Sequence, residues 1–198
     1  MTDPAVVLAK ANLRKQLRQA LAQVTPAERA RASAQARARL RRQPEWQQAQ
    51  TILFYAPLPD ELDLFPLAVE ALAAGRQVAL PRFAAATGAY AAAWIGDPAR
   101  DLAAGRFGVL EPQPDCPAMG LNRLDLLLVP GVGFDVSGRR LGRGRGYYDR
   151  LLLAVSGPRC GVAMDQQILP AIPTGPGDQR VDRLLTPTRW LVLQPGAA

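Results

Sequence analysis

The chain has 198 residues, 48% of them hydrophobic and 21% charged, which is enough to bury the core of one globular domain. It holds two cysteines and no histidine, so a disulfide framework, a Cys/His zinc site and histidine-activated nucleophiles are excluded. Acid and base chemistry is left to Asp, Glu, Lys, Tyr or a bound phosphate. The low cysteine content favours the reducing cytoplasm. The sequence contains no apolar run of about 18 residues, the length that would predict a membrane-spanning helix.

The net charge of +7 belongs to the N-terminal quarter of the chain. Residues 1–50 hold ten Lys and Arg against three Asp and Glu, whereas the rest of the chain is balanced. Only two of the 24 basic residues are lysine, and arginine forms bidentate pairs with phosphate and carboxylate groups. This distribution indicates a polyanionic ligand, while a solvated helix face explains most of these arginines taken singly.

The predicted elements alternate between helices and strands. Apolar spacing predicts a helix over residues 4–23, and a capping box at Thr25 and Glu28 predicts another over residues 26–42. Two more helices are expected: one over residues 64–74, capped by Asp63, and one over residues 147–155. Strands are expected at 51–55, 77–80, 89–95, 124–130, 159–163 and 188–193, with a turn-rich connection at 105–112. This order favours one α/β domain over residues 1–198 with a mostly parallel sheet and basic helices at about 4–42.

A glycine-rich segment, residues 131–146, follows the strand predicted at 124–130. Its glycines let backbone amides approach an anion, its arginines supply charge, and ligands of open α/β sheets bind beyond the carboxyl ends of strands. The segment has neither the Walker nor the Rossmann spacing. By composition alone, a flexible turn or an RNA-binding patch is favoured over a nucleotide site.

The longer segment LLVPGVGFDVSGRRLGRGRGYYDR resembles the signature of the 5-formyltetrahydrofolate cyclo-ligases, also called 5,10-methenyltetrahydrofolate synthetases. Six further blocks are similar to blocks of this family, in the same order: KANLRKQLR, FYAPLPDELD, VALPRF, GRFGVLEP, GVAMDQQILPAIP and GDQRVDRLLT. The resemblance implies a three-layer α/β/α sandwich with the basic first helix folded back over a nucleotide. Gly177 stands where members often carry His.

The resemblance implies an ATP-dependent, Mg²⁺-requiring ligase that cyclises 5-formyltetrahydrofolate to 5,10-methenyltetrahydrofolate and releases ADP and phosphate. ATP would phosphorylate the formyl oxygen, and N10 would attack the resulting iminium phosphate. A cytoplasmic monomer is expected, accepting the folate with or without a polyglutamate tail. The alternative is a basic RNA- or ribosome-associated module, which has no use for carboxylates inside the basic segment.

By match to the family's motifs, the resemblance also assigns roles to individual residues. Catalytic roles fall to Arg143, Arg145 and Tyr148. ATP would contact Lys10, Arg14, Arg140, Leu141, Gly142, Arg143, Gly144, Arg145, Gly146, Tyr147 and Tyr148. The folate would contact Ala56, Glu61, Arg143, Gly144, Arg145, Gly146 and Tyr147. Asp149 and Asp178 would hold Mg²⁺, which prefers oxygen ligands; without the resemblance they are a first-turn helix residue and a turn former.

Overall fold

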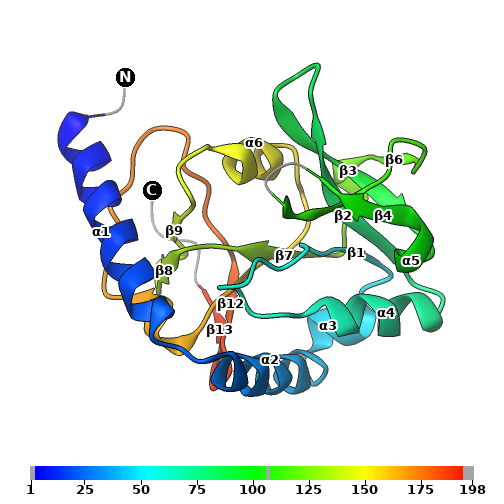
Figure 1. Cartoon of the computed structure of the whole chain (residues 1–198), viewed down its shortest axis with the longest axis horizontal. Coiled ribbons are helices and arrows are strands. Elements are labelled where there is room, and N and C mark those ends of the chain that lie inside the picture. Colours follow the sequence, from blue (N-terminus) through cyan, green and yellow to red (C-terminus); the bar gives the residue numbers. More distant parts are fainter. Residues whose placement is uncertain (1–2, 106–107, 194–198) are drawn as a thin grey trace.

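The computed structural model describes residues 3–105 and 108–193, and its centre is an eight-stranded sheet (Figure 1). The strand order is β13-β12-β10-β7-β1-β2-β3-β6. The strands are β1 (Thr51–Leu53), β2 (Gln77–Ala84), β3 (Ala89–Ile95), β6 (Ala118–Met119), β7 (Leu126–Pro130), β10 (Arg159–Val162), β12 (Arg183–Leu185) and β13 (Trp190–Val192). Neighbours from β12 to β2 pair in parallel, and the strands outside them pair antiparallel. The predicted α/β class with a mostly parallel sheet is confirmed.

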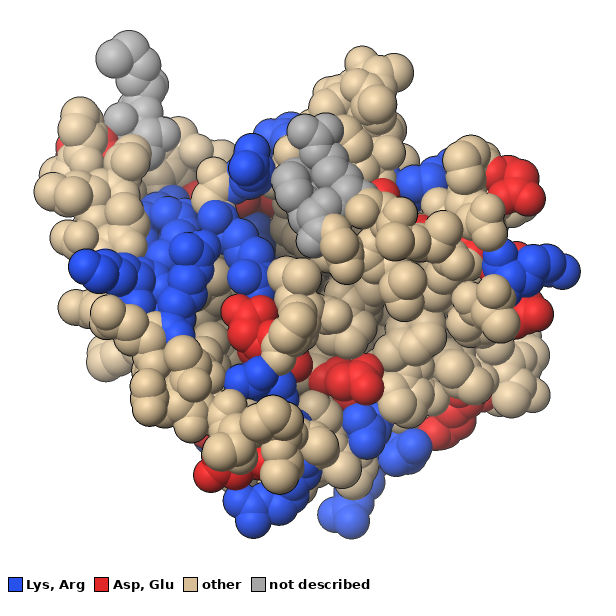
Figure 2. Space-filling view, viewed as in Figure 1, with Lys and Arg blue, Asp and Glu red and all other residues tan. Residues whose placement is uncertain are grey.

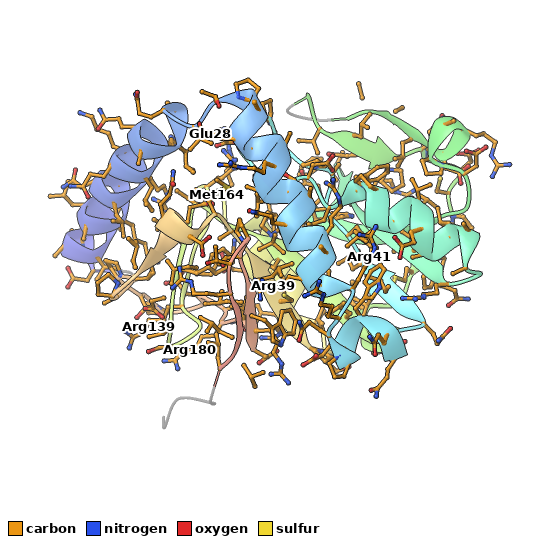
Figure 3. All side chains as sticks on the ribbon, turned by 90° about the horizontal axis from the view of Figure 1, so that it is seen from below. Glu28, Arg39, Arg41, Arg139, Met164 and Arg180 are labelled. Carbon is orange, nitrogen blue, oxygen red and sulfur yellow. The ribbon has the colours of Figure 1, made fainter. Side chains whose placement is uncertain are left out.

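Helices cover both faces of this sheet. On one face lie α2 (Pro26–Leu40), α3 (Pro44–Gln48) and α4 (Phe65–Ala73), and on the other lies α6 (Tyr147–Leu153) (Figure 1). Side chains alternate along each strand, so Leu126 and Leu128 enter the core under α2–α4 while Leu127 enters the core under α6. Seen from below, α2 and α4 lie side by side, joined by an ion pair between Arg41 and Glu70 (Figure 3). The three predicted layers are therefore present.

Smaller units surround this sandwich. A three-stranded sheet is formed by β8 (Gly133–Asp135), β9 (Arg140–Leu141) and β11 (Ile168–Leu169), and a hairpin by β4 (Leu102–Ala104) and β5 (Leu110–Pro112). The long helix α1 (Pro4–Ala22) packs on the small sheet through Leu17, which shares a core cluster with Leu141 and Ile172. Short turns of helix form α5 (Pro98–Asp101), η2 (Leu121–Arg123) and η3 (Asp165–Gln167). No helix in the described ranges is long and apolar enough to cross a membrane.

Local signals at helix starts agree with the predicted caps. Glu28 N–H donates to Thr25 Oγ1 at 3.2 Å while Glu28 Oε2 accepts from Thr25 N–H at 2.8 Å, which completes the capping box. Asp63 Oδ1 accepts from Phe65 N–H at 2.8 Å at the start of α4, although Leu64 occupies the cap position. The chain entering α2 and α4 is thus held by side chains next to the start of each of these two helices.

The structure differs from the predicted elements in several places. The glycine-rich segment is not an open loop, because β8 and β9 lie inside it and pair antiparallel. β2 does not end before Pro81 but continues to residue 84. β1 ends opposite Ala79, so beyond that point β2 pairs with β3 on one side, and a proline without an N–H is tolerated there. β12 and the small strand β11 lack a strong apolar run and were not predicted. Residues 106 and 107 of the predicted connection at 105–112 lie outside the described residues, and its last three form β5.

Candidate functional site

A cavity of about 360 Å³ opens at the carboxyl edge of the parallel strands. The ends of β1 and β7 contribute Tyr55, Ala56, Pro130 and Gly131 to its lining. The rest of the lining comes from the segment after β1 (Leu58, Glu61), from β2 and β3 (Pro81, Tyr90) and from the hairpin (Val109, Leu110, Glu111). It is completed by β9, the start of α6 and the stretch that joins them (Arg140, Gly142, Arg143, Arg145, Gly146, Tyr147, Tyr148, Asp149). Segments far apart in the sequence therefore meet at one edge of the sheet.

The lining includes three arginines, called here the basic side (Arg140, Arg143 and Arg145), and three tyrosines, called the aromatic side (Tyr90, Tyr147 and Tyr148). On the aromatic side, the ring centres of Tyr90 and Tyr147 lie 5.3 Å apart and nearly perpendicular, and those of Tyr90 and Tyr148 lie 6.4 Å apart. Edge-to-face packing of this kind is favourable and gives the wall a defined shape. The cavity therefore offers charge for an anion beside an apolar wall for a flat ring.

Arg140 is a buried cation on the basic side, with its side chain 3% exposed. Its Nη2 donates to Asp149 Oδ1 at 2.8 Å and its Nη1 to Pro130 O at 3.4 Å, and the guanidinium lies 5.7 Å from the centre of the Tyr148 ring. Its Nε has no hydrogen-bond partner in the part of the chain that the structure describes. A buried arginine with a donor to spare retains capacity to bind an anion.

Arg143 is held by two carboxylates from the segment after β1. Its Nη2 donates to Asp60 Oδ1 at 2.6 Å and to Glu61 Oε1 at 3.0 Å. Burial alone would lower the pKa of Arg143, but Glu61 and Asp60 outweigh it and the pKa is raised. Burial raises the pKa of Glu61, against the opposing effects of the Leu58 N–H and Arg143. These contacts join the segment after β1 to the glycine-rich segment and fix Arg143 as a cation at the cavity.

Helix α1 contacts the same region with two side chains. Arg14 Nε donates to Gly142 O at 2.7 Å, and Lys10 forms an ion pair with Asp178. Burial lowers the pKa of Arg14, and the nearby charge of Arg18 acts in the same direction. In the space-filling view, basic side chains form a band beside α1, with acidic side chains next to it (Figure 2). α1 therefore lies folded back against the edge of the cavity.

Most of the residues assigned through the resemblance lie together. Those that line the cavity are Ala56, Glu61, Arg140, Gly142, Arg143, Arg145, Gly146, Tyr147, Tyr148 and Asp149. Lys10, Arg14 and Asp178 lie outside this lining, and Arg14 approaches Gly144, which has a φ of +103°. Leu141 is fully buried in the core under α1, so its side chain is turned away and only its backbone is left for a ligand.

Sequence reasoning missed the contribution of the β4–β5 hairpin. Glu111 on β5 is 7% exposed and lines the cavity. Asp60, in the segment after β1, was also missed, and it pairs with Arg143. The available signal was a lone carboxylate within the apolar block GRFGVLEP, which resembled a family block without a role assigned to it. Nothing in the local pattern indicates that this block reaches the cavity.

Two carboxylates are the candidate metal ligands. Asp149 Oδ1 accepts from Arg140 and, at 3.3 Å, from the backbone N–H of Gln179, the residue after Asp178. Within residues 3–105 and 108–193, no three His, Cys, Asp or Glu side chains group in a way that could hold a metal ion. Mg²⁺ beside nucleotide phosphates needs only one or two carboxylates because phosphates and water supply the other oxygens. The residues present fit Mg²⁺ bound together with a nucleotide, and they do not form an all-protein cage.

The sheet, its two helical layers and the cavity at its carboxyl edge define an α/β protein of the class that binds ligands where its parallel strands end. The sequence model of the 5-formyltetrahydrofolate cyclo-ligase family matches residues 6–187, and the chain belongs to this family of ligases. The enzyme class and the folate chemistry predicted from the sequence are thereby confirmed, in preference to an RNA-binding module.

Individual relatives agree with this membership over most of their length. The chain is 36% identical over 147 residues to the 5-formyltetrahydrofolate cyclo-ligase of Mycolicibacterium smegmatis, covering 72% of this chain and 76% of the relative. It is 30% identical over 177 residues to that of Escherichia coli K12, covering 87% and 97%. The NMR structure of 5,10-methenyltetrahydrofolate synthetase from Aquifex aeolicus is similar with a TM-score of 0.85 and 33% identity, over 96% of this chain and 95% of that one.

Proposed function

We propose that the cavity binds ATP and 5-formyltetrahydrofolate together and that the chain closes the folate ring with Mg²⁺, releasing ADP and phosphate. The observation that carries this proposal is the meeting of a basic side and an aromatic side in one cavity. Guanidinium groups suit the phosphoryl groups of ATP, and packed rings suit a bicyclic pterin. Membership of the cyclo-ligase family supports the reaction.

The first step moves the γ-phosphoryl group of ATP to the formyl oxygen of the folate. The bond from phosphorus to ADP breaks as the bond to the formyl oxygen forms, which converts a poor leaving group into phosphate. Arg140, Arg143 and Arg145 stabilise charge on the transferring group, together with backbone amides of residues 142–146. The buried position of Arg140 strengthens its effect because water does not screen it.

Asp149 and Asp178 are the residues that would hold Mg²⁺, which would supply positive charge beside the phosphates. In the structure these carboxylates pair with Arg140 and Lys10. If these carboxylates held the metal, Arg140 and Lys10 would be available to the phosphates. Arg14, held at Gly142 O, adds a third cation beside them. The basic stripe of α1 thereby completes the nucleotide side of the cavity.

Ring closure follows when N10 of the folate attacks the formyl carbon. N10 passes its proton to the phosphate group, and the bond from carbon to the phosphate oxygen breaks, so that the protonated phosphate leaves. Ala56, Tyr147 and Tyr148 pack around the substrate, and Glu61 keeps Arg143 in place. Burial raises the pKa of Tyr148, so its phenol stays protonated and can donate a hydrogen bond. No step requires histidine.

Incubation of the pure protein with ATP, Mg²⁺ and 5-formyltetrahydrofolate tests the proposal through the near-ultraviolet absorbance of the methenyl product. Turnover should stop with EDTA and return with excess Mg²⁺, and full turnover in EDTA would contradict the metal assignment.

Arg143→Ala should lower turnover about hundredfold, while Arg31→Ala, at an exposed position on α2, serves as the matched control. A wild-type protein that forms no product would refute the proposal. A monomeric state, a cytoplasmic location and acceptance of polyglutamate tails remain predictions.

A further inference from the structure

Glu111 is a buried carboxylate on the aromatic side of the cavity. No Lys or Arg within the described ranges forms an ion pair with it. Its Oε2 accepts from Phe83 N–H at 3.0 Å, whereas its Oε1 lies 3.4 Å from the Tyr90 hydroxyl, which is long for a hydrogen bond between oxygens. Buried carboxylates are normally paired or fully hydrogen-bonded. Oε1 therefore retains the capacity to accept a strong donor.

The backbone around Glu111 holds its carboxylate at the cavity. In the described part of the chain, β2 has no strand neighbour on the β1 side beyond Ala79, and Glu111 Oε2 satisfies the Phe83 N–H on that edge. The side chain of Glu111 crosses the hairpin directly over Gly105, where an added Cβ would lie 2.5 Å from Glu111 Cδ. Only glycine leaves room for this path, so the position of the Glu111 carboxylate depends on glycine at residue 105.

Glu61 and Glu111 both line the cavity but differ in what they have left to offer. Glu61 Oε1 accepts from Nη2 and Nε of Arg143, and its Oε2 accepts from Leu58 N–H at 3.0 Å. Both of its oxygens are therefore used by the protein. Among the described residues, Glu111 has one oxygen bonded to the Phe83 N–H and one whose hydrogen bond, from the Tyr90 hydroxyl, is long. A ligand N–H can bind Glu111 without breaking a bond that the protein already makes.

We propose that Glu111 is a substrate-recognition residue whose Oε1 accepts an N–H donor of the folate ring while that ring packs against the aromatic side. The proposal rests on the proposed function and adds a recognition residue to it. A pterin combines a flat apolar face with N–H donors at its edge, which matches Tyr90 and Glu111 side by side. The triphosphate would be repelled by this carboxylate, so the ring rather than the nucleotide occupies its surroundings.

Isothermal titration of wild type and Glu111→Gln tests the assignment, with 5-formyltetrahydrofolate and with ATP plus Mg²⁺ as separate ligands. The amide oxygen of the variant can still accept the Phe83 N–H, so the fold is preserved. The Kd for the folate should rise about tenfold or more, because a charge-assisted bond becomes a neutral one. The Kd for ATP should stay within about twofold, since no contact with the nucleotide is lost.

Two further variants and one probe separate recognition from support of the fold. Tyr90→Phe keeps the ring and removes the hydroxyl near Oε1, so the folate Kd should change less than about threefold. Gly105→Ala should weaken folate binding as Glu111→Gln does, because the added Cβ displaces the carboxylate. The fragment p-aminobenzoylglutamate lacks the pterin ring, and its affinity should be equal in wild type and Glu111→Gln.

Several outcomes would overturn the assignment. An unchanged folate Kd in Glu111→Gln contradicts it directly. Equal losses for both ligands with a lower melting temperature would show a purely structural role, and a large fall in kcat with unchanged folate Kd would show a role in proton transfer. If the wild-type protein binds no 5-formyltetrahydrofolate, the proposed function itself is wrong, so the two failures are distinguishable.

Discussion

The basic residues of the N-terminal quarter fall into two groups that use their charge differently. On α1, Lys10 and Arg14 extend to the edge of the cavity, where their partners belong to the proposed nucleotide site. On α2, the side chains of Arg37 and Arg39 bind backbone oxygens elsewhere in the fold. Both groups consist of basic side chains, and they lie on helices that follow one another in the chain. Their roles differ only because α1 faces the glycine-rich segment and α2 faces the sheet.

The contacts of α2 show what its arginines do. Arg37 Nη1 donates to Asp63 O at 2.6 Å, just before α4, and Arg39 Nε donates to Pro187 O at 3.2 Å, between β12 and β13. Figure 3 shows Arg39 on α2 and Arg41 just after its end, in the helical layer that lies in front of the sheet in this view. The guanidinium groups of Arg37 and Arg39 thus satisfy backbone carbonyls in connecting segments of the described chain. Net charge alone therefore overstates the surface available to a polyanion.

Of the predicted effects, the largest should be that of Asp149→Asn, which changes the proposed nucleotide site beside α1. We expect turnover to fall about hundredfold or more, because a metal-binding charge is removed from the phosphoryl-transfer site. Stability should fall by about 1–3 kcal/mol, since buried Arg140 loses its charged partner. The absorbance assay and thermal denaturation measure the two effects. Normal turnover with a loss below about 1 kcal/mol would identify Asp149 as only a first-turn helix residue.

Lys10→Ala should raise the KM for ATP about tenfold, because one charge-assisted contact to phosphate is lost. Lys15→Ala is the matched control, since Lys15 is exposed on the same helix. Its KM for ATP should stay within about twofold of wild type. Steady-state kinetics with varied ATP give both values. Similar increases for the two variants would mean that α1 acts through its overall charge rather than through Lys10.

Arg37→Ala should affect stability and leave catalysis unchanged. The loss of its bond to Asp63 O should lower the free energy of unfolding by about 1 kcal/mol, with kcat/KM within about twofold of wild type. Chemical denaturation and the absorbance assay measure the two quantities. A specific loss of ATP affinity in Arg37→Ala would contradict the division between the two groups.

The smallest expected effect concerns Glu61, the partner of Arg143. Because burial raises the pKa of Glu61, the folded protein binds its proton more readily than the unfolded chain does. That contribution to stability is present below the ordinary glutamate pKa and is lost as the pH rises through the folded-state pKa. Glu61→Gln cannot titrate, so its stability relative to wild type should increase between about pH 4 and pH 7. Urea denaturation at both pH values tests the sign, and an opposite trend would show that Arg143 outweighs burial.

By itself, the sequence determined the features that depend on neighbouring residues. The capping box of Thr25 and Glu28, the buried run of residues 126–130 and the helix after Gly146 are local patterns whose physics is contained in a few positions. The family resemblance carried the identity of the reaction, because long motifs hold the residues that the chemistry needs. These features required no knowledge of which segments meet.

Only the tertiary structure decided which side chains share the cavity. Arg143 meets Glu61 across 82 residues of sequence, and Glu111 reaches the aromatic side from a hairpin that sits beside the free edge of β2. The same holds for β2 continuing through Pro81, which depends on where β1 ends. Such contacts follow from strand order, register and the ends of neighbouring strands. No local pattern contains that information, because each contact is made by segments that fold next to each other only when the whole sheet has assembled.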